Sequence, residues 1–217
     1  MSAAFSKSVR IPMASKQADA LNNYGLFLAE QGRSEEAERQ YKEALRLQAD
    51  HPAAHNNYAL LLYESNRLPQ ALEHLNAALT AQPNYPEALN NRGLVLAALQ
   101  QPDTAEADYH RALALRPDYP EAHNNLALLL AEKDLDDDAM SHYREALELK
   151  PNYTHALNNS AILLMKNNDL AEAERRLLQA LRIDPAYRDA HLTYAELLKR
   201  NGLNDEAERQ YKLALGQ

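Results

Sequence analysis

Several residue types are missing or rare in this chain, and each absence argues against a class of function. The sequence has no cysteine, no tryptophan and only 5 glycines among its 217 residues. Without cysteine the chain can form neither a disulfide nor a thiolate metal site, and it has no cysteine nucleophile. Glycine is too sparse for a glycine-rich phosphate loop, and no G-x-S-x-G nucleophile turn occurs. We therefore expect no catalysis, no cofactor and no metal site.

Positive charge and long apolar segments are scarce as well. The 23 basic residues are outnumbered by 31 acidic ones, which gives a formal net charge of -8. Such a chain lacks the basic surface that binds nucleic acids or anionic membranes. No stretch approaches the roughly 18 apolar residues of a membrane-spanning helix, and residues 1–17 lack the apolar core of a secretory signal. We expect no nucleic-acid partner, no direct membrane insertion and a cytoplasmic location; earlier removal of a signal leaves a periplasmic or secreted chain as the alternative.

What the chain does contain is a repeat of 34 residues. The segment ALNNYGLFLAEQGRSEEAERQYKEAL, which starts at Ala20, matches AHNNYALLLYESNRLPQALEHLNAAL from Ala54, and the same register returns four more times without insertion or deletion. Residues 1–17 form a lead-in that is either partly disordered or the start of the first helix. The six repeats are predicted at residues 18–51, 52–85, 86–119, 120–153, 154–187 and 188–217.

Small and large residues occupy fixed positions of the repeat. Position 8 is Gly or Ala, positions 20 and 27 are always Ala, and position 11 is always Leu. Small side chains allow two helices to approach closely, while leucine fills the layer between them. Position 24 carries a large residue that we expect to pack toward the next repeat. Its six members are Tyr41, Leu75, Tyr109, Tyr143, Leu177 and Tyr211.

Each repeat has the start and stop signals of two helices. Pro52, Pro86 and Pro120 stand at position 1, where the missing N–H of proline does not weaken a helix. Position 15 holds Gly or Asn in four repeats, and these residues tolerate the left-handed conformation that ends a helix. A second helix follows within a few residues and ends near a proline at position 32. Because no segment alternates polar and apolar residues as a strand would, the chain is predicted to be all-α.

These positions resemble the pattern of the tetratricopeptide repeat, which has small residues at position 8, Ala at 20 and 27, an aromatic residue at 24 and Pro at 32. The resemblance extends over residues 18–217. Position 4 departs from the pattern because it alternates Leu and His, and Ala49 replaces the proline of the first repeat. The resemblance implies a right-handed superhelical solenoid of six helix-turn-helix repeats. Its first helices would line a concave groove that binds an extended peptide or a partner helix.

Asparagine fills two adjacent positions that, by this resemblance, face the groove. Five successive repeats carry Asn at both position 5 and position 6. An amide offers two donors and two lone pairs, so a ladder of amides can bind the backbone of an extended peptide whatever its sequence. A similar ladder serves that purpose in O-linked N-acetylglucosamine transferases. The alternative is that the amides cap helices, pair between neighbouring helices or face water. The candidate peptide-binding asparagines are Asn22, Asn23, Asn56, Asn57, Asn90, Asn91, Asn124, Asn125, Asn158 and Asn159.

The floor of the groove is predicted to be apolar beside these amides. Such a floor suits a peptide with hydrophobic side chains or an inserted helix, and the alternative is that it packs against the second helices. Acidic residues dominate the groove in the first four repeats and basic residues at the far end. A ligand of opposite polarity would match this charge, unless the charges are simply solvated. The candidate contacts from positions 9, 12 and 13 are Leu60, Tyr63, Leu94, Leu128, Met165 and Lys166.

Three histidines share position 4 but are not predicted to form a metal site. His55, His123 and His191 are two whole repeats apart, which is too far for one ion because histidine ligands lie about 2 Å from zinc. We interpret them as replacements for the large residue of that position. The acidic run at residues 136–138 stands at a helix start, where negative charge is favourable, and we interpret it as part of that start.

Three functions compete at this point. The preferred one is an adaptor that binds a protein or peptide in the groove. The second is a self-assembling scaffold. Stacked repeats need terminal caps and the sixth repeat has no extra capping helix, so either its fairly polar last helix caps the array or the uncapped end forms a homo-oligomer. The third is the substrate-recruiting repeat domain of a larger enzyme. A fold alone does not decide among them.

Overall fold

The computed structural model describes residues 13–216, in which every regular element is an α-helix and no strand occurs. The all-α prediction is therefore confirmed. Residues 13–17 of the predicted lead-in belong to the first helix, and residues 1–12 lie outside the described part. The helices are α1 (Met13–Glu30), α2 (Ser34–Leu47), α3 (Pro52–Glu64), α4 (Leu68–Ala81), α5 (Pro86–Ala98), α6 (Pro102–Leu115), α7 (Pro120–Glu132), α8 (Asp136–Leu149), α9 (Thr154–Lys166), α10 (Leu170–Ile183), α11 (Arg188–Arg200) and α12 (Asn204–Ala214).

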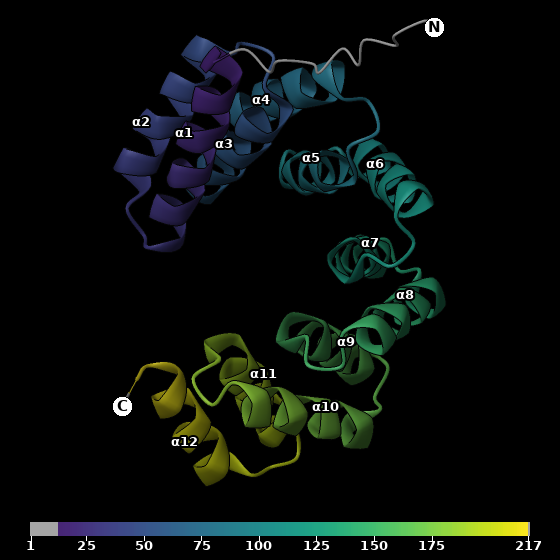
Figure 1. Ribbon diagram of the computed structural model, residues 1–217. Helices are drawn as coiled ribbons and strands as arrows, with labels where there is room; N and C mark the ends of the chain where they lie inside the picture. The colour runs from purple at the N-terminus through teal and green to yellow at the C-terminus, as the bar shows by residue number, and fades with distance from the viewer. Residues whose placement is uncertain (1–12, 217) are drawn as a thin grey trace, which may run out of the picture. The chain divides into compact units, whose positions relative to one another are not determined.

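Consecutive helices form hairpins, so each repeat contributes a first helix and a second helix (Figure 1). Helix α1 packs on α2, α3 on α4, α7 on α8, α9 on α10 and α11 on α12. First helices also contact the first helix of an adjacent repeat, as α1 does with α3 and α9 with α11. These contacts divide the chain into two compact units, with the boundary between Asp108 and Tyr109.

A residue in the left-handed conformation ends the first helix of every repeat. Glycine and asparagine were the expected residues at position 15, and the structure places Gln100 and Asp134 in the same conformation. The fold imposes this conformation there against a cost of roughly 1–2 kcal/mol per residue. The six φ values are 72° at Gly32, 56° at Asn66, 59° at Gln100, 59° at Asp134, 61° at Asn168 and 78° at Gly202.

The fixed small residues lie where two helices touch. The alanines at positions 20 and 27 are buried in all six repeats. At position 8, a Cβ added to Gly25 would lie 2.7 Å from Cε1 of the buried Tyr41 ring, which is inside van der Waals contact. Helix α1 therefore approaches α2 more closely than a side chain at Gly25 would allow without movement of that ring.

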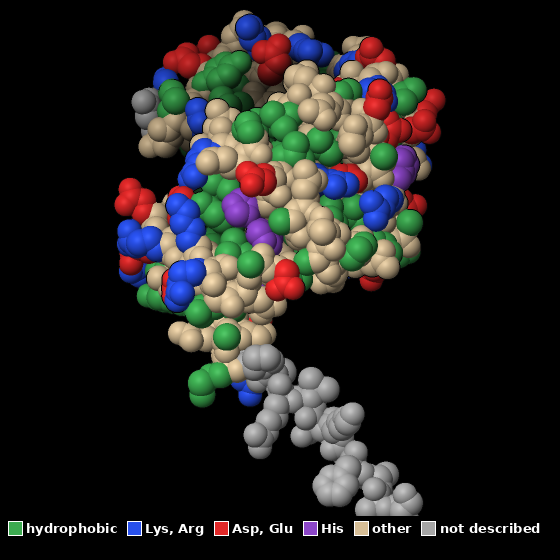
Figure 2. Space-filling view, turned by 90° about the horizontal axis from the view of Figure 1, so that it is seen from above, with side chains coloured by type: hydrophobic (Ala, Val, Ile, Leu, Met, Phe, Trp, Pro, Cys, Tyr) green, Lys and Arg blue, Asp and Glu red, His purple; other side chains and the backbone are tan. Residues whose placement is uncertain are grey.

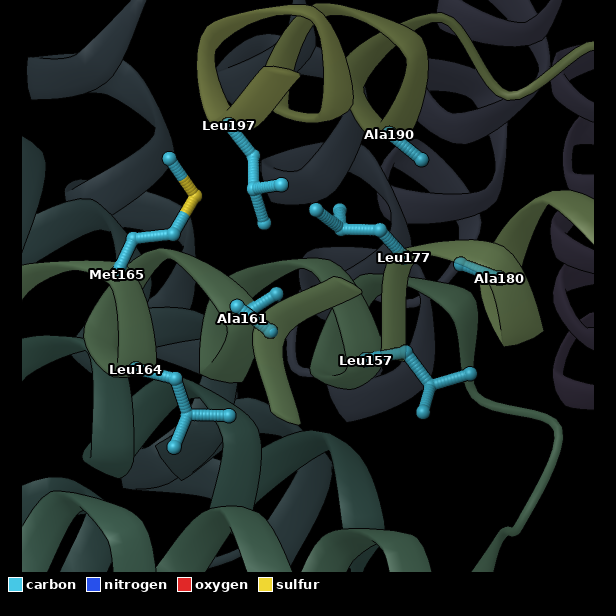
Figure 3. Packing of buried hydrophobic residues seen from close by; sticks show 9 residues of the cluster. Leu157, Ala161, Leu164, Met165, Leu177, Ala180, Ala190 and Leu197 are labelled. Atoms are coloured by element: carbon cyan, nitrogen blue, oxygen red, sulfur yellow. The ribbon is translucent and has the colours of Figure 1, made fainter. Parts of the chain in front are cut away.

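The core of the fifth repeat shows how the large residues fill the space between helices. Leu157 and Ala161 from α9, Leu177 from α10 and Leu197 from α11 belong to one buried cluster (Figure 3). Leu177 occupies position 24 and is fully buried. Leu197 belongs to the sixth repeat. Leu177 of the fifth repeat therefore packs toward the next repeat, as the sequence pattern predicts.

The third repeat contains a buried ion pair between its two helices. The guanidinium of Arg92 in α5 donates from Nε to Oδ2 of Asp108 at 2.6 Å and from Nη2 to Oδ1 at 2.7 Å. It also donates from Nη1 to Oδ1 of Asn76 in the preceding repeat at 3.0 Å. The Asp108 side chain is almost completely buried. The aspartate therefore depends on this one bidentate partner for its charge compensation.

Histidines at position 4 contact a second histidine at position 23 of the same repeat. Nδ1 of His55 lies 2.8 Å from Nδ1 of His74, and His123 and His142 repeat this contact at 3.0 Å. Nε2 of His55 donates to the carbonyl oxygen of Ala49, because a carbonyl can only accept. In this tautomer Nδ1 of His55 accepts from the Nδ1–H of His74. A proton added at Nδ1 of His55 would place two N–H donors face to face.

We expect the chain to lose stability as the pH falls below about 6.5, the ordinary pKa of histidine. Burial lowers the pKa of His74 and of His142, and the neighbouring histidine of each pair lowers it further. The unfolded chain then binds protons that the folded chain excludes. The stabilisation is fully present above about 6.5 and is lost as the pH falls toward the lower pKa of the folded state. Urea unfolding at about pH 7.5 and about pH 5.5 measures the difference.

A matched variant separates the histidine pairs from the carboxylates, which also titrate in acid. In the sixth repeat Gln210 takes position 23, and its Oε1 lies 2.6 Å from Nδ1 of His191. Replacing His74→Gln and His142→Gln together installs this non-titrating partner in both pairs. The difference between the two pH values should shrink in the double variant. An equal difference in both proteins would contradict the assignment.

Candidate functional site

The predicted asparagine ladder is present, and its amides bond to one another. In three rungs of this ladder, Nδ2 of a position 6 asparagine donates to Oδ1 of the position 5 asparagine in the preceding repeat. The distances are 3.0 Å from Asn57 to Asn22, 2.9 Å from Asn91 to Asn56 and 3.1 Å from Asn159 to Asn124. The alternative of pairing between neighbouring helices is thus what the structure shows for these amides.

A second set of bonds joins the two asparagines of one repeat. Nδ2 of position 5 donates to Oδ1 of position 6, and the position 5 amides are buried in all five repeats while the position 6 amides are more exposed. An amide has two N–H donors and two lone pairs, so Asn57 and Asn91 each keep one donor and one lone pair beyond the ladder. Peptide contact by these amides stays a prediction. The distances are 3.3 Å for Asn22 and Asn23, 3.2 Å for Asn56 and Asn57, 3.3 Å for Asn90 and Asn91 and 3.2 Å for Asn124 and Asn125.

The ladder stops at the fifth repeat and leaves an unsatisfied atom there. Oδ1 of Asn158 is buried without a hydrogen-bond partner among the described residues. The next rung would come from position 6 of the sixth repeat, which is Thr193, and its hydroxyl donates instead to the carbonyl oxygen of Asp189 at 2.9 Å. A threonine side chain is too short to reach across, so the sequence change from Asn to Thr explains the orphaned acceptor.

Replacing Thr193→Asn is expected to stabilise the chain by about 0.5–1.5 kcal/mol, because the new amide can donate to the buried Oδ1 of Asn158. Thermal and urea unfolding measure the gain. The matched control is Thr80→Asn on α4, because the Thr80 hydroxyl makes the same bond to a carbonyl four residues back, at 2.8 Å, away from the ladder. The control should be neutral or slightly destabilising, and an equal response of the two variants would contradict the prediction.

Apolar pockets lie beside the ladder in both units and at the same repeat positions. In the first unit a pocket of about 40 Å³ lies between α1 and α3, and in the second unit one of about 190 Å³ lies between α7 and α9. Residues of positions 9, 12 and 24 of one repeat and of positions 6, 9, 10 and 13 of the next line each pocket. The first is lined by Leu26, Ala29, Tyr41, Asn57, Leu60, Leu61 and Glu64. The second is lined by Leu128, Ala131, Glu132, Tyr143, Asn159, Ile162, Leu163 and Lys166.

The tyrosine of each pocket adds no charge near neutral pH. Burial raises the pKa of Tyr41 to about 12, and burial also raises the pKa of Tyr143. Sequence reasoning assigned position 24 to packing between repeats and did not place it in the groove. The signal for this placement was the recurrence of a large residue at position 24, since Tyr41 and Tyr143 each line a pocket between two successive first helices.

The other residues predicted to contact a peptide differ in their exposure to solvent. Leu60 and Leu128 are exposed pocket residues, while Tyr63 and Leu94 are half-buried and line neither of these two pockets. Met165 is buried in the core cluster with Leu157 and Leu177. This methionine therefore belongs to the core shared by α9, α10 and α11 and not to the exposed groove surface.

Charged residues of the groove form ion pairs within the chain. Nζ of Lys166 lies 2.7 Å from Asp134 and 2.8 Å from Asp136. Its predicted role in attracting an acidic ligand is thereby weakened, because two carboxylates neutralise it. On the face shown in Figure 2, acidic and basic side chains lie close together, with hydrophobic side chains between them.

The described residues contain neither a candidate metal site nor a candidate membrane-spanning helix. No group of three or more His, Asp or Glu side chains in residues 13–216 could hold a metal ion. Over the same range, every helix is too short or too polar to cross a bilayer.

Family models match most of the chain. A tetratricopeptide repeat model matches residues 25–86, 90–154 and 158–217, and a second tetratricopeptide repeat model matches residues 129–184. No curated protein sequence matches the chain at a significant level. The matches of the first model extend over more than half of the chain, so the resemblance seen in the fixed positions holds along its length.

Solved structures share the fold at low sequence identity, which shows the fold alone. The chain is similar to the pilF product of Pseudomonas aeruginosa, with a TM-score of 0.76 and 21% identity over 91% of this chain and 90% of that one. A tetratricopeptide repeat protein of Parabacteroides merdae is similar with a TM-score of 0.77 and 22% identity, over 92% of this chain and 78% of that one. YrrB, described as a tetratricopeptide repeat protein with an unusual peptide-binding site, is similar with a TM-score of 0.57 and 24% identity, over 80% of this chain and 89% of that one. The predicted fold of stacked helical repeats is confirmed, and the chain belongs to the tetratricopeptide repeat family.

Proposed function

We propose that the groove binds an extended peptide, whose apolar side chains enter the pockets beside the position 6 asparagines. The membership of the family supports a function in protein–protein interaction. The observation that carries the finer proposal is the recurrence of one kind of pocket in both units, with Asn57 at one and Asn159 at the other. A role of this kind needs no catalytic group.

The walls of the pockets indicate which peptide fits. Alternate side chains of an extended peptide point to the same side, so one can fill a pocket while the neighbouring backbone groups face the amides. Leu128 and Ile162 give the larger pocket apolar walls that suit a leucine, isoleucine or methionine side chain. Each pocket also has a carboxylate, from Glu64 or Glu132, which would pair with a basic residue next to the apolar one.

Selection of phage-displayed random peptides on the full chain tests this proposal. We expect enrichment of sequences with an apolar residue beside a lysine or arginine. Replacing Ile162→Asp places a charge in the wall of the larger pocket and should weaken binding of a selected peptide by at least about tenfold, which corresponds to 1.4 kcal/mol. The matched control is Leu178→Asp, because Leu178 is exposed on α10 and lines neither pocket.

Unchanged binding by the Ile162 variant would overturn the proposal for the second unit, and Leu60→Asp tests the first unit in the same way. Alanine at position 6 is a weaker test. Replacing Asn57→Ala removes the donor to Asn22 and the acceptor for Asn56, so it disturbs buried amides as well as the groove surface. A loss of binding in that variant would need a thermal melt to separate the two causes.

A further inference from the structure

We infer that two copies of this chain stack head to tail, with α1 of one copy on α12 of the next. This inference is independent of the proposed peptide binding because it uses the ends of the array and not the groove. It starts from a likeness within the chain. Residues 36–42 and 206–212 both read EAERQYK and occupy the same repeat positions in α2 and α12. Helix α3 packs on α2, and that contact is the template for the one that we infer at α12.

The contact between α2 and α3 centres on a glutamate. Glu38 accepts from the hydroxyl of Tyr58 at 2.7 Å and from Nη1 of Arg67 at 2.9 Å. Within α2, Nζ of Lys42 lies 2.7 Å from the same carboxylate. The rings of Tyr41 and Tyr58 lie 6.1 Å apart across the contact. Two polar bonds and an aromatic pair thus join positions 21 and 24 of one repeat to positions 7 and 16 of the next.

This arrangement holds a charged glutamate and recurs in the second unit. Burial disfavours the charged form of Glu38, but the hydrogen bonds from its three donors outweigh this and lower its pKa to about 2. At the junction of the fifth and sixth repeats, the hydroxyl of Tyr194 donates to Oε1 of Glu174 at 3.0 Å. Tyrosine at position 7 on glutamate at position 21 is therefore a recurring way to join two repeats in this chain.

Helix α12 presents the glutamate half of the contact to solvent. Nζ of Lys212 lies 2.6 Å from Oε1 of Glu208, as Lys42 does with Glu38 in α2. Tyr211 is 37% exposed, whereas the equivalent Tyr41 is 1% exposed. Leu215 is exposed as well. The described residues leave uncovered here the side chains that an internal repeat covers with the following helix.

Helix α1 presents the tyrosine half. Residues 22–24 read Asn-Asn-Tyr, as residues 56–58 do in α3. Tyr24 is 47% exposed and stacks on the exposed Phe27, whereas the equivalent Tyr58 is 3% exposed. Arg33 stands at position 16 and so corresponds to Arg67; its Nε and Nη2 donate to Glu36, whereas Arg67 binds Glu38 through Nη1. A second copy therefore supplies a tyrosine and an arginine for Glu208, and an aromatic ring for Tyr211.

One feature of an internal junction is missing from this contact. Position 5 of the sixth repeat is Leu192, so Asn23 meets no ladder acceptor across the two copies. The copies are also not joined by a linker, so association bears the full loss of translational and rotational freedom. We expect reversible stacking with a Kd weaker than about 1 μM. Because the two faces differ, the contact is heterologous and can repeat.

Two variants with exposed substitution sites test the stacking. Tyr24→Glu blocks the α1 face, and Leu215→Glu blocks the α12 face. Sedimentation velocity on the full chain, at concentrations up to about 1 mM, should show concentration-dependent association of the wild type. Each variant alone should remain monomeric. An equal mixture should form a 1:1 dimer that grows no further, because each variant keeps the face that the other lacks.

The other outcomes overturn the inference. A wild-type chain that is monomeric over the whole concentration range has no such contact. Association of one variant by itself would show symmetric pairing through the remaining face. Two monomeric variants whose mixture stays monomeric would show that the blocked faces do not meet each other. Circular dichroism of both variants confirms that the helices are retained before these results are compared.

Discussion

Replacing Asp108→Ala is expected to lower the free energy of unfolding by about 3–5 kcal/mol. The substitution leaves the guanidinium of Arg92 in a mostly buried site without the two short bonds that compensate its charge. Removing one partner of a buried ion pair is costly for this reason, even where the intact pair contributes little net stability. Urea unfolding followed by circular dichroism measures the loss.

A double variant shows whether the cost arises from the stranded charge. In the fourth repeat position 7 is Leu126, which is fully buried. Replacing Arg92→Leu together with Asp108→Ala removes both charges and places in the third repeat a residue that this position already accommodates. The double variant should be more stable than Asp108→Ala alone. A double variant that is less stable would mean that the aspartate acts through its shape and not through its charge.

Replacing Leu177→Ala is expected to cost about 2–5 kcal/mol, because it removes apolar contacts and leaves a cavity between three helices. Leu177 comes from α10 and lies beside Leu197 and Ala190 of α11 in the buried cluster (Figure 3). Urea unfolding gives the total effect. Hydrogen exchange gives its location, and faster exchange should be concentrated in α9, α10 and α11 because each repeat contacts only its neighbours.

The neighbouring residue provides the control for this prediction. Leu178 is 42% exposed and Leu177 is 0% exposed, although both are leucines on the same helix. Alanine favours a helix at least as well as leucine, so Leu178→Ala should change stability by no more than about 0.5 kcal/mol. Similar losses in the two variants would mean that the cluster does not stabilise the fifth repeat.

The helix pairs could be predicted from the sequence because their signals repeat at a fixed spacing. Pro52, Pro86 and Pro120 each begin a helix, and small residues at fixed positions mark where helices touch. The backbone conformation of Gln100 and Asp134 could not be predicted in the same way. Glutamine has no preference for the left-handed conformation and aspartate adopts it only occasionally, yet both take it at position 15 between two packed helices.

The site could be predicted only as a set of positions and not as a set of contacts. The double row of asparagines was visible, and pairing between helices was one of its open interpretations. Which amide bonds to which depends on an offset of 35 residues across two helices, as from Asn22 to Asn57, and no local pattern reveals that offset. The pair of His55 and His74 was missed for the same reason, since 19 residues separate its members.

The ladder also bears on how the chain is made. Synthesis delivers the first repeats before the last, and domains generally fold as units in that order. As the first helices of repeats two, three and five emerge, their asparagines can close rungs such as Asn57 to Asn22 on the repeat already formed. The sixth repeat brings Thr193 and docks without a rung. Nascent chains stalled on the ribosome should therefore gain resistance to protease in steps of one repeat, with the smallest step at the last.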